Sequence, residues 1–216
     1  MDFWGTDNFL INLDTSVFLF FNAYLTHPIL DFIMTRITHL TFWIIPGLIA
    51  AAWFIKRERK KAFIVLGLII LTIIITDQTS TQFLKKFFAR PRPCHPDFLV
   101  EGGRFLMGMR RSIVSFPSSH SGNMFALAML LFNFYPRRAV YFFGFASMIA
   151  YSRVYIGVHY PIDILGGAVF GCTAGAGVYW GYKAICQKIN ASASRKIEEI
   201  TVSKEDAPAP VETEST

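Results

Sequence analysis

Long apolar stretches that lack charged residues are the feature that most limits how this chain can fold. They run through Leu40–Phe54, Ala62–Thr76, Asn123–Tyr135, Ala139–Ala150 and Ile164–Tyr182. Only 17% of the 216 residues are charged, whereas a soluble globular domain carries about 25%. A helix needs about 20 mostly apolar residues to cross a bilayer. The sequence therefore predicts an all-α, polytopic membrane protein.

Flanking polar residues that reach the interface or line a protected interior extend these stretches to spanning length. The predicted helices are Phe32–Trp53, Lys61–Lys85, Ser119–Phe134, Arg138–Ser152 and His159–Lys183. An aromatic run, Thr15–Tyr24, is about ten residues long and is either a tilted first span or an interfacial helix. Counting it, we expect about six helices. We divide the chain into an N-terminal segment (1–12), a membrane domain (13–188) and a disordered polar tail (189–216).

The distribution of basic residues predicts the orientation. The cluster Lys56–Lys61 and the pair Arg137–Arg138 fall on one side, which the positive-inside rule makes cytoplasmic. The long loop Phe87–Phe116 is then external, in the periplasm if the membrane is a bacterial inner membrane. This loop and its approach carry Lys85, Lys86, Arg90, Arg92, Arg104, Arg110 and Arg111. Such a cluster indicates either a polyanionic ligand, since guanidinium groups match phosphate oxygens, or attraction to anionic headgroups.

Three polar stretches meet this external face at predicted helix ends. In the last one, His159 and Asp163 are four residues apart, so they share a helix face. A carboxylate there can bind one imidazole nitrogen and leave the other for a substrate, as a nucleophilic histidine requires. The spacing also occurs in purely structural pairs. An ionisable pair at a helix end in lipid is costly unless it is used or well satisfied.

In the middle stretch, His120 follows Pro-Ser-Ser and precedes an apolar helix. Ser118 or Ser119 is a plausible N-cap, and a helix N-terminus binds anions. His120 would lie beside a bound phosphoryl group and could protonate a leaving oxygen. A plain turn and cap explains the serines but not the histidine.

In the first stretch, Pro91 and Pro93 end a helix between Lys85 and Arg92. Taken alone, these cations and Arg153 are typical of side chains that snorkel at an interface. Together with two histidines, an acid and a helix N-terminus on one face, they indicate phosphoryl transfer, which needs an in-line nucleophile, a proton donor and charge stabilisation.

These stretches resemble the type 2 phosphatidic acid phosphatase family, which is related to the vanadium haloperoxidases. The family pattern is K-x6-RP, PSGH and SR-x5-H-x3-D. It reads here as KKFFARPRP from Lys85 to Pro93, PSSH from Pro117 to His120 and SRVYIGVHYPID from Ser152 to Asp163. The spacing of the first and third parts is met without adjustment. Ser119 replaces the usual glycine, so this sequence has a side chain where the family pattern has none.

The resemblance implies a bacterial membrane lipid phosphatase of about six helices that uses no metal and no cofactor. It implies that His159 attacks phosphorus, that Asp163 orients it, and that His120 protonates the leaving group and then activates water. It further implies a phosphate pocket formed by Lys85, Arg92, Arg153, Ser118 and the backbone at Ser119. The expected partners are the bilayer and a lipid phosphate, with no nucleic acid.

Several functions remain open at this point. Undecaprenyl diphosphate, or a broad range including phosphatidylglycerophosphate and phosphatidic acid, is the favoured substrate, and lipid A is an alternative. A haloperoxidase would use the same pocket for vanadate, but multiple membrane spans weigh against it. A protein that binds or transports anionic lipids would need the cations but not a His159–Asp163 pair facing His120.

Overall fold

The computed structural model describes residues 8–109 and 114–205, with side chains up to residue 197, and every regular element in these ranges is helical. The predicted all-α class is therefore confirmed. The helices are α1 (Phe9–Leu19), α2 (Pro28–Ile37), α3 (Leu40–Glu58), α4 (Lys60–Thr79), α5 (Lys85–Phe88), α6 (Ser119–Phe134), α7 (Ala139–Tyr155) and α8 (Pro161–Glu205). Two π-helical segments, Phe20–Tyr24 and Ser80–Leu84, follow α1 and α4, and 3₁₀ turns occupy Pro96–Phe98 and Pro136–Arg138. Arg110 and Arg111 of the predicted basic loop lie outside the described residues.

Three helices in the described ranges are long and apolar enough to cross a membrane. They are Leu40–Glu58, Lys60–Phe88 and Pro161–Ile197. A fourth span results if Phe9–Tyr24 and Pro28–Ile37, which meet at a bend of 115°, count as one. With α6 and α7, of 16 and 17 residues, these elements account for the predicted bundle of about six helices.

The boundaries of the helices differ from the predictions where polar contacts interrupt an apolar run. The sequence predicted one helix over Phe32–Trp53, but α2 ends at Ile37 and α3 begins at Leu40. The Trp43 indole donates to the Ile37 carbonyl over 2.8 Å, which satisfies one of the carbonyl groups left without a helical partner at the C-terminal end of α2. The polar residues Arg36, Thr38 and His39 mark this break in the sequence, a signal that the predicted single helix passed over.

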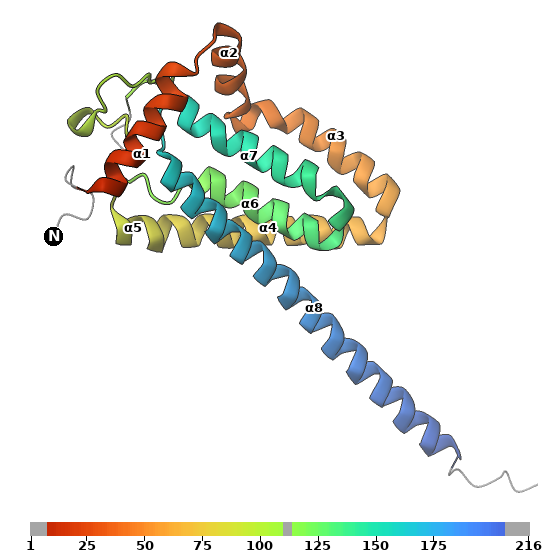
Figure 1. The fold of residues 1–216 in the computed structure, drawn as a ribbon. Coiled ribbons are helices and arrows are strands. Elements are labelled where there is room, and N and C mark those ends of the chain that lie inside the picture. The colour runs from red at the N-terminus through yellow and green to blue at the C-terminus, as the bar shows by residue number, and fades with distance from the viewer. Residues whose placement is uncertain (1–7, 110–113, 206–216) are drawn as a thin grey trace, which may run out of the picture. The chain divides into compact units, whose positions relative to one another are not determined.

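Close contacts bring α8 against α6. A Cβ atom on Gly171 would lie 2.2 Å from the Gly122 carbonyl oxygen, and one on Gly175 would lie 2.2 Å from that of Ala126. Small residues are what allow membrane helices to approach this closely. The α6 helix also packs along α7 and α4. Figure 1 shows that α1, α5, the C-terminal end of α7 and the N-terminal ends of α6 and α8 meet at one end of this bundle.

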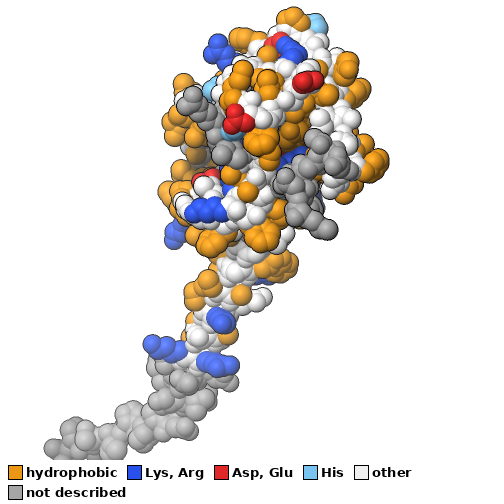
Figure 2. Space-filling model, turned by 90° about the vertical axis from the view of Figure 1, so that its left-hand side faces the viewer, with side chains coloured by type: hydrophobic (Ala, Val, Ile, Leu, Met, Phe, Trp, Pro, Cys, Tyr) orange, Lys and Arg blue, Asp and Glu red, His pale blue; other side chains and the backbone are white. Residues whose placement is uncertain are grey.

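On the face that Figure 2 shows, exposed apolar side chains lie among polar and charged ones. Leu40, Ile45 and Phe63 expose 79%, 69% and 65% of their surface. Exposed apolar area on this scale is typical of a lipid-facing surface.

The C-terminal unit, Trp180–Thr216, is described up to residue 205 as a continuation of α8. The helix thus runs past Lys188, where the sequence predicted a disordered tail to begin. Residues 189–205 contain no proline or glycine that would end a helix. Residues 206–216 of that predicted tail lie outside the described part of the chain.

Candidate active site

The three motif stretches converge at the end of the bundle where α1, α5, α6, α7 and α8 meet. Lys85 is the first residue of α5, Arg92 follows in the loop, and Ser118 is the N-cap of α6. Arg153 lies in the last turn of α7 and Asp163 in the first turn of α8, with His159 between these helices. The structure therefore brings together all eight residues predicted for the site, namely Lys85, Arg92, Ser118, Ser119, His120, Arg153, His159 and Asp163.

The imidazole of His159 is fixed on one side and faces a cation on the other. Its Nδ1 atom lies 3.4 Å from Asp163 Oδ2 and 3.2 Å from Ser115 Oγ. Its Nε2 atom lies 3.3 Å from Arg92 Nη1. A proton on Nδ1 satisfies Asp163 and leaves the Nε2 lone pair directed at the position of the Arg92 guanidinium.

Burial keeps this imidazole neutral. His159 is 2% exposed, and this desolvation lowers its pKa to about 3, although the hydrogen bond to Asp163 acts in the opposite direction. Arg92 lowers the pKa further by repulsion. A neutral imidazole at physiological pH is the form that can attack phosphorus.

The carboxylate of Asp163 accepts hydrogen bonds on both oxygens. Arg90 Nη1 donates to Oδ1 over 2.8 Å, and the Ser115 hydroxyl and the Tyr160 backbone N–H donate to Oδ2, the latter over 2.9 Å. The bond from Tyr160 resembles one half of a capping box, because Asp163 is the third residue of α8. Asp163 thereby fixes the start of its own helix as well as His159.

Arg90 and Asp14 belong to this site although the motif pattern did not indicate them. Arg90 Nη2 donates to Asp14 Oδ2 over 2.6 Å, and the Ile162 N–H donates to Asp14 Oδ1 over 2.9 Å. The guanidinium also stacks 4.0 Å from the ring centroid of Tyr160. Asp14 directly precedes the predicted aromatic run Thr15–Tyr24 and is the one acidic residue of α1, a signal that could have identified it.

Two cations of the predicted phosphate pocket, Arg92 and Arg153, are buried and held by neighbouring groups, and the third, Lys85, is half-buried. Arg92 Nη1 donates to the Val158 carbonyl over 3.2 Å, and Arg153 Nη1 donates to Thr38 Oγ1 just beyond α2. Lys85 lies close enough to both arginines to interact with them electrostatically. Like charges gathered in this way are costly unless an anion binds between them.

The start of α6 completes the pocket. Ser118, one of the two serines predicted for this position, is the N-cap, and its buried Oγ has no hydrogen-bond partner among the described residues. Ser119 Oγ lies 3.2 Å from Ser80 Oγ of the π-helical segment, so its side chain has a partner of its own. His120 is exposed and lies within electrostatic range of His159 and Arg153. A group bound by the cations would thus have His120 beside it.

The loop between α5 and α6 is tied to the site by polar contacts. Asn22 accepts from the Arg104 N–H over 2.6 Å and donates to the Tyr155 carbonyl over 2.8 Å. The Arg104 side chain binds Asp31, so this member of the basic cluster has a structural role. Gly157 lies so near that a Cβ there would be 2.3 Å from the Arg104 carbonyl oxygen, and its φ of 84° suits glycine.

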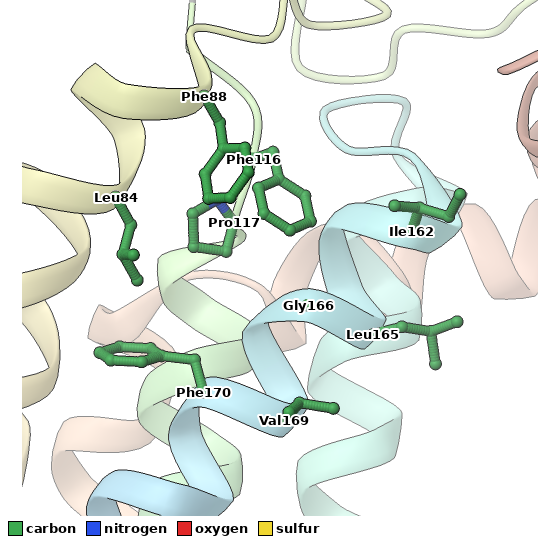
Figure 3. Close-up of a pocket in the computed structure, with 9 residues that line it drawn as sticks. All are labelled: Leu84, Phe88, Phe116, Pro117, Ile162, Leu165, Gly166, Val169 and Phe170. Atoms are coloured by element: carbon green, nitrogen blue, oxygen red, sulfur yellow. The ribbon is translucent and has the colours of Figure 1, made fainter. Parts of the chain in front are cut away.

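An apolar groove of about 500 Å³ adjoins the site (Figure 3). Its lining side chains come from the region of α5, from the loop before α6 and from α8, and include Phe88, Phe116 and Val169. Three other lining residues, Leu84, Pro117 and Ile162, immediately precede Lys85, Ser118 and Asp163 in the chain. The groove therefore lies next to the polar pocket. In the described ranges, no three His, Cys, Asp or Glu side chains are grouped to hold a metal ion.

This fold and site define a helical membrane protein with a buried histidine that lies beside an aspartate and near two arginines. The chain belongs to the PAP2 superfamily, which residues 61–185 match. It is 34% identical over 180 residues to a lipid A 4'-phosphatase of Porphyromonas gingivalis, covering 81% of this chain and 75% of that protein. It is 31% identical to phosphatidylglycerophosphatase B of Bacillus subtilis, covering 67% and 71%.

A solved structure, LpxE of Aquifex aeolicus, superposes with a TM-score of 0.61 at 29% identity and covers 77% of this chain and 94% of that one. The PAP2 match and these phosphatase relatives establish a multi-pass membrane phosphatase, a phosphoric ester hydrolase that acts on lipids. The family predicted from the three motifs is confirmed.

Proposed function

We propose that this phosphatase removes a phosphate monoester from a lipid A type glycolipid through a phosphohistidine on His159. The observation that carries the mechanism is the arrangement of His159, with Nδ1 held by Asp163 and Nε2 facing Arg92. The sequence alone favoured undecaprenyl diphosphate or a broad range of lipids. Relatives named lipid A 4'-phosphatase at 34% and 31% identity over most of the chain support the lipid A alternative.

In the first step, the Nε2 lone pair of His159 forms a bond to phosphorus as the bond to the lipid oxygen breaks. Desolvation and the neighbouring cations lower the pKa of His120 to about 3 in the protein alone. The negative charge of the bound phosphate would raise this pKa, so that protonated His120 gives its proton to the leaving oxygen. The new positive charge on the imidazole is balanced by Asp163, which keeps its bond to Nδ1–H. In the second step, water attacks the phosphoryl group, His120 takes its proton, and inorganic phosphate and free His159 result.

The phosphoryl oxygens would be bound by the cations around His159. Arg92 would turn from the Nε2 atom to an incoming oxygen, and Arg153 and Lys85 would bind from the other sides. The buried Ser118 hydroxyl, which has no hydrogen-bond partner in the part of the chain that the structure describes, would donate to the same group. The first N–H groups of α6 add an anion-binding helix N-terminus.

The apolar groove supports a lipid as the substrate. An acyl chain in the groove would leave the polar headgroup beside Ser118 and Asp163, because the groove residues Pro117 and Ile162 precede them directly. With the Lys56–Lys61 cluster in the cytoplasm, this end of the bundle faces the periplasm or exterior of the inner membrane. The headgroup would then be presented from the outer leaflet.

Phosphate release by the purified protein tests the proposal. The substrates are bisphosphorylated lipid A, undecaprenyl diphosphate, phosphatidylglycerophosphate and phosphatidic acid, each in detergent with a chelator, and mass spectrometry identifies the lipid A position that is hydrolysed. We expect the highest kcat/KM with lipid A, loss of the 4'-phosphate, and no turnover by His159→Ala. Faster hydrolysis of another lipid overturns the substrate, and activity in His159→Ala overturns the mechanism.

A further inference from the structure

We propose that Asp14 and Arg90 are positioning residues of the reaction, which hold the Asp163 carboxylate in line with His159. The inference rests on the proposed roles of His159 and Asp163. Arg90 occupies an unspecified position of the K-x6-RP motif, and Asp14 lies outside the family match at residues 61–185. Both are nevertheless buried, at 2% and 3% exposure.

The contacts form a continuous chain from α1 to the nucleophile. Asp14 Oδ2 binds Arg90 Nη2, Arg90 Nη1 binds Asp163 Oδ1, and Asp163 Oδ2 lies next to His159 Nδ1. One guanidinium thus bridges two carboxylates with different nitrogens. A planar fork suits this bridge, whereas the single ammonium of lysine could not hold both partners at fixed angles.

The charges of this chain of contacts suit the reaction. Two carboxylates and one guanidinium leave one negative charge in excess while His159 is neutral. Phosphoryl transfer makes the imidazole positive, and the excess charge is then balanced. Without Asp14, the positive charge of Arg90 would be balanced by Asp163 alone. The interaction of Asp163 with the imidazolium of His159 would then be weaker.

Asp14 also places the helix that carries Asp163. Its Oδ1 accepts the Ile162 N–H, one of the N-terminal donors of α8 that lack a partner within the helix. The side chain therefore caps α8 from a different helix. A shift of the start of α8 would move Asp163, because Asp163 directly follows Ile162 in the chain.

Kinetics of variants in the full-length protein test the proposal. With p-nitrophenyl phosphate, Asp14→Asn should lower kcat about tenfold, as expected for one charged hydrogen bond, and change KM by less than about twofold. Asp31→Asn is the matched control, because it removes another Asp–Arg pair, with Arg104. Its kcat should equal that of the wild type. Arg90→Lys keeps the buried charge and should also lower kcat about tenfold. This variant tests the proposal if Asp14→Asn does not fold.

A double-mutant cycle shows whether Asp14 acts through Arg90. In an Arg90→Met background, Asp14→Asn should change kcat by less than about twofold, whereas independent roles would give additive losses. Additive losses overturn the proposal, as does wild-type kcat in Asp14→Asn or Arg90→Lys. The proposal is also overturned if Asp31→Asn loses as much kcat as Asp14→Asn while the two variants melt at the same temperature. Failure of the proposed function is separate, because it would appear as turnover by His159→Ala.

Discussion

Replacing Asp163 by asparagine should affect both the fold and the reaction, and the two effects can be separated. Asp163 accepts from Arg90 at Oδ1 and from Ser115 and the Tyr160 N–H at Oδ2. An amide has one oxygen and one NH₂ group, so each orientation places a donor against a donor. The substitution therefore removes a charge, and it also places the amide NH₂ group against another buried hydrogen-bond donor.

The expected loss of stability follows from the partners that remain. Removing one member of a buried ion pair costs about 3–5 kcal/mol. Arg90 keeps its 2.6 Å bond to Asp14, so we expect a loss near the lower end, about 3 kcal/mol. Since small domains have a total stability of about 5–15 kcal/mol, Asp163→Asn should still fold but melt at a lower temperature.

The expected loss of turnover is larger. With the amide oxygen kept toward Arg90, the NH₂ group faces His159 Nδ1 and forces its proton onto Nε2, the attacking atom. The corresponding aspartate-to-asparagine change in a serine protease lowers kcat about 10⁴-fold because the wrong tautomer is present. We expect a loss of about 10³-fold to 10⁴-fold here, equivalent to about 4–5.5 kcal/mol.

A triple variant separates the two losses. Asp14→Asn, Arg90→Met and Asp163→Asn together remove every charge of the bridge, and neutral replacement of a whole buried network is often neutral or stabilising. Its unfolding temperature should exceed that of Asp163→Asn, while phosphate release stays at the level of the single variant. Turnover by Asp163→Asn within about tenfold of the wild type, or recovered turnover in the triple variant, would refute the assigned role.

Three further predictions concern the pocket, the groove and the orientation. Activity should survive a chelator, because cations take the place of a metal ion, and vanadate should inhibit competitively; loss of activity on chelation that magnesium restores would contradict this. Val169→Trp in the groove should raise the KM for the lipid substrate about fivefold and leave p-nitrophenyl phosphate hydrolysis unchanged. Val140→Trp, at another exposed valine, should change neither. Equal effects of the two variants would exclude the groove as the binding site of an acyl chain. The natural Cys94 of the predicted external loop is fully buried, so orientation is tested with Asp97→Cys, at a side chain that is 81% exposed. This cysteine should react with an impermeant thiol reagent in intact cells, and Arg59→Cys should not. The opposite pattern would reverse the orientation.

The helical class and the eight motif residues were predictable because each depends on local pattern. Hydropathy over about 20 residues identifies a membrane helix, and the Ser119–Phe134 prediction coincides with α6. The break between α2 and α3 depends instead on single polar contacts, those of Trp43 with Ile37 and of Arg153 with Thr38. The second of these contacts joins residues 115 positions apart, and such a contact leaves no trace in the hydropathy of either segment.

The π-helical segments explain why a prediction from periodicity alone misplaces side chains near the site. The sequence predicted one regular helix over Lys61–Lys85, but Ser80–Leu84 is π-helical and Lys85 comes directly after it. One extra residue in a turn rotates the following side chains by about 100°. The same insertion occurs at Phe20–Tyr24 and includes Asn22, which ties the loop at Arg104 to the end of α7 by its bonds to Arg104 and Tyr155. Regular helix geometry would place Lys85 and Asn22 on other faces, so the packing that favours these π turns decides which polar groups reach the site.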